Sequence, residues 1–185
     1  MNCNEATRSA TWPRYPRDRR TIATHEAGHL VAWLAFGLTP DRLDARLAPC
    51  GTGGAVTRLD ANGQPASAPG TLDPLHRESG NVSMCFERQC LQWAAMFCAG
   101  YAAEARLHEV ADRDSDWWQA LAGEPDMKNA AAFVSFGYPD RAEALTSAWQ
   151  YANELLAGHW RWVQRVAREI ERNGHCSGER AVALK

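Results

Sequence analysis

The sequence predicts a mainly α-helical domain of the α+β class, with a small β-hairpin or sheet after its first helix. Long stretches with apolar residues at helical spacing fall at residues 82–108 and 140–172. Two short segments around a glycine turn, within residues 42–59, have the pattern of strands. The chain has 185 residues, of which 45% are hydrophobic, so it is long enough to bury one core without disulfides.

The first predicted helix covers residues 21–37 and is apolar over most of its length. Thr21 is a plausible N-cap, because its hydroxyl can accept a hydrogen bond from the first turn. Gly37 and Pro40 supply a stop. A long apolar helix of this kind is expected to lie in the core.

This helix contains the run His25-Glu26-Ala27-Gly28-His29. Positions i and i+4 lie on one face of a helix, so both imidazoles can reach one metal ion. The Glu26 carboxylate would lie beside the open metal position, where zinc lowers the pKa of a bound water to about 7. Two such histidines can also be a surface or core pair, but charged groups in an apolar helix are costly unless a metal or a partner satisfies them. We therefore expect a Zn²⁺ site here, with Glu26 as the general base.

Two strands are predicted at residues 42–47 and 54–59, with the turn between them built around Gly51, Gly53 and Gly54. The exposed edge of such a hairpin can hold an extended peptide by main-chain hydrogen bonds. Alternatively, the hairpin only covers the core.

The remaining elements follow from composition and periodicity. Residues 61–80 are rich in proline and glycine and predict a loop insertion. Helices are expected at residues 82–108, 127–136 and 140–172. The domain boundaries that result are a flexible basic arm at 1–20, a single domain at 21–172 and a C-terminal tail at 173–185.

The composition narrows the functional classes. The net charge of −2 gives no bulk electrostatic reason to expect a nucleic-acid partner. No apolar stretch approaches the roughly 18 residues of a membrane span, and the start of the chain lacks the apolar core of a secretory signal. Six cysteines without C-x-x-C spacing are typical of reduced thiols in a core. These features predict a cytoplasmic protein.

A catalytic zinc ion usually has three protein ligands, so a third is expected from elsewhere in the chain. The other histidines lie in a loop, at a helix end, in the long final helix and in the tail, so carboxylates are better candidates. Asp126 and Glu104 are the two candidate carboxylates for this third ligand. Asp126 also fits a helix N-cap, since it follows a proline and precedes a helical segment.

Three blocks of this sequence together resemble the peptidase domain of the FtsH-type AAA zinc metalloproteases. They run from His25 to His29, from Gly100 to Glu104 and from Gly123 to Met127, in the family's order. The resemblance extends over roughly residues 20–172, and the first block is its most specific part.

The resemblance implies a helical zinc-metallopeptidase domain. It implies that His25, His29 and Asp126 bind zinc, that Glu26 is the general base, and that Glu104 is a buried supporting carboxylate. Tyr101 stands where the family usually has arginine, so an ion pair made by that arginine would be missing.

The chain contains no G-x-x-x-x-G-K-[ST] phosphate-binding loop, so it carries no ATPase module of that type. The expected function is a zinc-dependent endopeptidase that cleaves unfolded or flexible polypeptide segments without ATP, or with a separate ATPase or delivery partner. The alternatives are a stand-alone peptidase that cuts one regulatory protein and a non-catalytic zinc-binding interaction module. Whether the chain forms a homo-oligomer is left open by the sequence.

Overall fold

The computed structural model describes residues 17–49, 53–58, 82–110 and 121–185. The predicted loop insertion at 61–80 and most of the predicted arm lie outside these ranges. The described elements, in chain order, are helix α1 (Arg19–Ala35), a 3-10 turn (Pro40–Arg42), strands β1 (Leu43–Leu47) and β2 (Gly54–Arg58), helices α2 (Val82–Leu107), α4 (Pro125–Gly137) and α5 (Arg141–Asn173), strand β3 (His175–Ser177) and helix α6 (Gly178–Ala183). The predicted fold class, mainly helical with a small antiparallel sheet, is confirmed.

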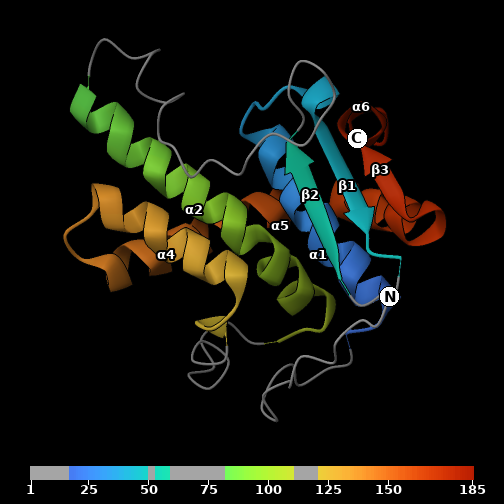
Figure 1. Ribbon diagram of the computed structural model, residues 1–185, viewed down its shortest axis with the longest axis horizontal. Helices are drawn as coiled ribbons and strands as arrows, with labels where there is room; N and C mark the ends of the chain where they lie inside the picture. Colours follow the sequence, from blue (N-terminus) through green and yellow to red (C-terminus); the bar gives the residue numbers. More distant parts are fainter. Residues whose placement is uncertain (1–16, 50–52, 59–81, 111–120) are drawn as a thin grey trace.

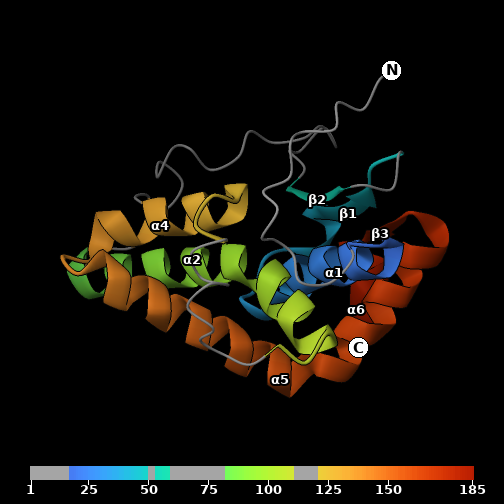
Figure 2. The same ribbon diagram turned by 90° about the horizontal axis from the view of Figure 1, so that it is seen from below.

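The helices and the sheet form three layers, which Figure 2 shows from the side. The long helix α5 runs beneath the pair α1 and α2. On the opposite side of that pair, α4 lies over α2 and the sheet lies over α1. Residues from β2 and from the start of α4 line one cavity together with the histidine motif of the middle layer.

Helix α1 begins earlier than expected. Its N-cap is Asp18, whose Oδ1 accepts a hydrogen bond from the Thr21 amide at 2.8 Å, so the prediction of Thr21 as the cap is wrong. A carboxylate at this position also interacts favourably with the positive end of the helix dipole. All residues from Thr21 to Trp33 are buried. The helix thus crosses the core, as its apolar sequence predicts.

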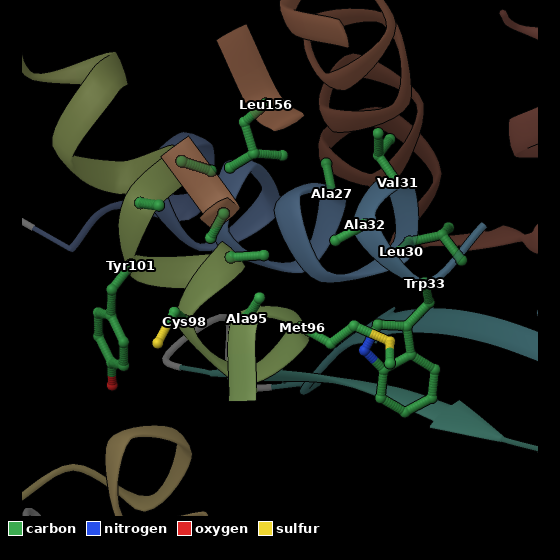
Figure 3. Packing of buried hydrophobic residues seen from close by; sticks show 14 of the residues in the cluster. Ala27, Leu30, Val31, Ala32, Trp33, Ala95, Met96, Cys98, Tyr101 and Leu156 are labelled. Atoms are coloured by element: carbon green, nitrogen blue, oxygen red, sulfur yellow. The ribbon is translucent and has the colours of Figure 1, made fainter. Parts of the chain in front are cut away.

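Small residues let α1 and α2 approach closely. A Cβ on Gly28 would lie 2.5 Å from the Ala99 carbonyl oxygen, so no larger residue fits at this position without moving the helices apart. Figure 3 shows the packing of buried side chains from these helices, with Ala27 and Val31 of α1 on the side of Leu156 from α5. Tyr101 leaves α2 on the other side, toward α4. The close contact makes the α1–α2 pair a rigid base for the site.

The sheet is antiparallel with strand order β2-β1-β3, so its third strand comes from the end of the chain. Residues 173–185 were expected to form a tail, and that prediction is wrong. Gly174 adopts a left-handed conformation with φ of 79°, which ends α5 and turns the chain into β3. Cys176 of β3 is buried and is paired with Ala45 of β1, and the Trp162 indole donates to the Ala181 carbonyl at 2.7 Å.

The sequence also predicts that the chain has no membrane span and that its core cysteines are reduced. Within the described ranges, no helix is both long enough and apolar enough to cross a membrane. Cys90, Cys98 and Cys176 are free and buried, as expected of reduced core cysteines.

Candidate metal centre

Helix α1 places the two histidines of the motif side by side, one turn apart. The Nε2 atoms of His25 and His29 lie 3.0 Å from each other, and both rings are buried. Their planes are nearly perpendicular, with centroids 4.7 Å apart. This arrangement is the one expected from the i, i+4 spacing.

Asp126 completes a group of three on the same side of the rings. Its Oδ2 atom lies 3.1 Å from Nε2 of His25 and 3.2 Å from Nε2 of His29. It is not the N-cap of α4, because Glu124 occupies that position and Pro125 is the first helical residue. Asp126 is therefore placed inside the first turn, pointing at the histidines, and the three residues can hold a metal ion.

The separations among these atoms fit such an ion, and Gly100 of α2 is packed against both rings. A Cβ on Gly100 of α2 would lie 2.4 Å from Nε2 of His29 and 2.5 Å from Nε2 of His25. Both rings therefore pack directly against the backbone of Gly100, and a side chain at this position would displace them. Ligand atoms of a tetrahedral zinc site lie about 3.3 Å apart, close to the separations seen among the three groups.

Both rings are oriented by hydrogen bonds at their other nitrogen. Nδ1 of His25 donates to Oε1 of Glu104 at 2.6 Å, and Nδ1 of His29 donates to the Met96 carbonyl at 2.8 Å. With a proton on Nδ1 of each ring, Nε2 is the nitrogen that can bind a metal once it is deprotonated. Glu104, the second candidate for a third ligand, lies on the far side of His25 from Asp126 and supports the ring instead.

Arg17 is a contact of the site that the sequence analysis did not identify. Its Nη2 lies 3.0 Å from Oε1 of Glu104, and its guanidinium lies over the Tyr101 ring at 5.9 Å from the centroid. The residue belongs to the segment predicted to be a flexible arm. No local pattern marks it, because its partner is 87 positions away in the sequence.

Glu26 lies between the histidines and the sheet. A Cβ on Gly54 of β2 would lie 2.7 Å from Oε1 and from Cγ of Glu26, so the strand approaches this carboxylate closely. The sequence predicts Gly54 at the junction of the turn and the second strand, but nothing in it indicates a contact with Glu26. In the structure it is the first residue of β2 and sits against the carboxylate proposed as the base.

A cavity of about 300 Å³ connects these groups. His25, Glu26, His29 and Asp126 line its centre. The other lining residues include the apolar side chains of Trp33, Val56 and Phe97 and the polar side chains of Arg17, Tyr101 and Glu124. Residues 53–55 and Pro125 complete the lining. Tyr101 donates a hydrogen bond to Glu124 Oε2 at 2.9 Å, so a tyrosine here links α2 to the start of α4.

The charges at the site influence one another strongly. Burial lowers the pKa of His25, but hydrogen bonds to Asp126 and Glu104 outweigh it and raise the pKa to about 10. Burial raises the pKa of Asp126, and the two histidines overcome this and bring it well below its ordinary value. Burial raises the pKa of Glu26, an effect that His25 and His29 reduce only in part. A carboxylate with a raised pKa is a stronger base than one in water.

Comparisons with known proteins give no family for this chain. No protein-family model matches the sequence, and no curated protein shows significant similarity to it. The geometry of the site is therefore the basis for inferring a function.

Proposed function

We propose that this protein is a zinc-dependent endopeptidase of the FtsH peptidase type. The observation that carries the proposal is the convergence of Nε2 of His25, Nε2 of His29 and Oδ2 of Asp126, which lie 3.0 to 3.2 Å apart beside Glu26 in one cavity. Two imidazoles and one carboxylate form a ligand set typical of catalytic zinc in peptidases. Zinc, when bound, polarises a carbonyl and lowers the pKa of water to near neutral.

Glu26 supplies the proton transfers of the reaction. It accepts a proton from the water that attacks the carbonyl carbon of the substrate. When the C–N bond breaks, Glu26 returns this proton to the leaving amine, so the carboxylate is regenerated and one water is consumed. The raised pKa of Glu26 favours the first of these transfers.

The sheet supplies a binding surface for an extended polypeptide. Among the described residues β2 is at the edge of the sheet, since β1 lies between it and β3. Residues 53–56 of this edge line the cavity. A substrate segment that pairs with β2 would pass the metal centre, which favours unfolded or flexible segments as substrates. Trp33, Val56 and Phe97 would accept an apolar side chain of the segment.

The proposal extends to how substrates reach the site. The sequence contains no nucleotide-binding loop, so the chain would act without ATP or receive its substrate from a separate ATPase or delivery partner. Cleavage of a single regulatory protein is compatible with the same site. Free buried cysteines support a reducing, cytoplasmic location.

Substitution of Glu26 by glutamine tests the proposal. The zinc-loaded variant should keep its metal, because Glu26 is not one of the three converging groups, and should lose at least ~100-fold in the rate of cleavage of an unfolded protein such as casein. Glu154→Gln, at an exposed position of α5, is the matched control and should behave as wild type. Cleavage by Glu26→Gln at the wild-type rate, or no cleavage by the zinc-loaded wild type, would contradict the proposal.

A further inference from the structure

Arg17 and His25 share one oxygen atom of a carboxylate that is fully buried. Oε1 of Glu104 lies 2.6 Å from Nδ1 of His25 and 3.0 Å from Nη2 of Arg17, and Glu104 has no exposed surface. A buried carboxylate is costly unless charged or hydrogen-bonded partners stabilise it. Arg17 supplies a permanent positive charge at this position, because a guanidinium stays protonated.

Arg17 is held in place by contacts on both sides. Next to it, Asp18 caps α1 through the Thr21 amide. On its other side, the guanidinium lies over the Tyr101 ring, and the side chain is only 22% exposed. The residue is therefore held between the start of α1 and the face of α2 that carries Glu104.

We propose that Arg17 is a positioning residue of the metal centre, which acts through Glu104. By binding Oε1, it holds the carboxylate against Nδ1 of His25 and keeps Nε2 of that ring directed at the ion. The residues that precede α1 are thereby coupled to the metal centre. This inference rests on the zinc site of the proposed function, and it does not require that the protein cleave peptides.

The test is a double-mutant cycle in zinc affinity, measured by competition with a chelating dye. Arg17→Met should weaken zinc binding about tenfold. Loss of a group that hydrogen-bonds to a metal ligand typically weakens metal binding by about 10- to 100-fold, and Arg17 acts one step further away, through Glu104. In a Glu104→Gln background the same substitution should change the affinity less than twofold, because the carboxylate through which Arg17 acts is gone. Arg17→Lys, which keeps a cation, should recover part of the loss. The absorption spectrum of the Co²⁺-loaded protein should change in Arg17→Met and return toward wild type in Arg17→Lys.

Arg19→Met is the matched control, because Arg19 lies in the same segment but donates to the Glu171 carbonyl of α5. It should leave zinc affinity unchanged. Thermal unfolding of each metal-free variant shows whether it is folded, and Arg17→Gln provides a second substitution if Arg17→Met is unstable. Unchanged affinity in the folded Arg17 variants, or the same loss in both backgrounds, would overturn the proposal. A non-additive cycle in a protein without peptidase activity would support Arg17 and refute the proposed function, whereas absence of zinc binding by wild type would refute both.

Discussion

The half of the site built on α1 and α2 differs from the half built on α4 and β2. His25, His29 and Glu104 come from two helices packed in the core and are at most 7% exposed. The Asp126 side chain is 27% exposed and belongs to the first turn of a helix, while Gly54 begins an edge strand. The first half cannot shift without disturbing the core. The second half can adjust, so we expect β2 to govern substrate access and the position of the Glu26 carboxylate rather than metal binding.

The largest effect is expected from filling the space between the helices. Gly100→Ala would place a methyl group within 2.6 Å of both imidazoles, which carry two of the three proposed ligand atoms. We expect zinc affinity to fall by more than ~1000-fold, since overpacking must move a ring or a helix. Zinc content after dialysis measures this. Gly158→Ala is the control, because a Cβ there meets nothing within 4 Å. Equal zinc retention by the two variants would refute the claim that the half of the site on α1 and α2 is rigid.

A smaller effect, on the catalytic rate and not on zinc binding, is expected from a substitution in strand β2. A Cβ on Gly54 would displace the Glu26 carboxylate, whereas a Cβ on Gly53 meets nothing within 4 Å. Gly54→Ala should keep zinc but lower kcat about 10- to 100-fold, because a small displacement of a catalytic group has effects of this size. Gly53→Ala should retain wild-type kcat. If Gly54→Ala lost zinc instead, the two halves would not be separable in this way.

The smallest expected effect is the release of protons when zinc binds. The pKa of His25 near 10 means that the metal-free ring is protonated at pH 7, and a metal ligand must be deprotonated. Zinc binding at pH 7 should therefore release about one proton, which calorimetry in buffers of different ionisation enthalpy measures. Binding without proton release would show that His25 is already neutral.

The same pKa gives the sign of a stability effect in the metal-free protein. The pKa of His25 is raised from 6.5 to about 10, so protonation of this ring stabilises the fold fully below pH 6.5. This contribution declines as the pH rises through 10. Thermal unfolding of the metal-free protein should show that decline, and His25→Ala should not.

The sequence anticipated the long helices better than the parts that join them. The helix predicted at 140–172 is observed at Arg141–Asn173, because its apolar stripe repeats at helical spacing over many turns. The start of α1 was predicted at Thr21, but Asp18 is also a good N-cap residue and takes that position in the structure. The assignment of 173–185 to a tail failed because β3 is only three residues long and is stabilised by its pairing with β1. So short a strand has no pattern of its own.

Local sequence by itself determined that His25 and His29 share one face of a helix, with Glu26 between them, because positions four apart are neighbours whatever the rest of the chain does. Asp126 and Glu104 were candidates from the sequence, and their separate roles were expected only from the predicted resemblance to the FtsH-type peptidase domain. Tertiary structure alone decided that Asp126 meets His25 across 101 positions, that Glu104 takes the opposite ring nitrogen, and that Arg17 and Gly54 reach the site. These contacts depend on how the layers pack, and no local periodicity encodes packing between segments so far apart.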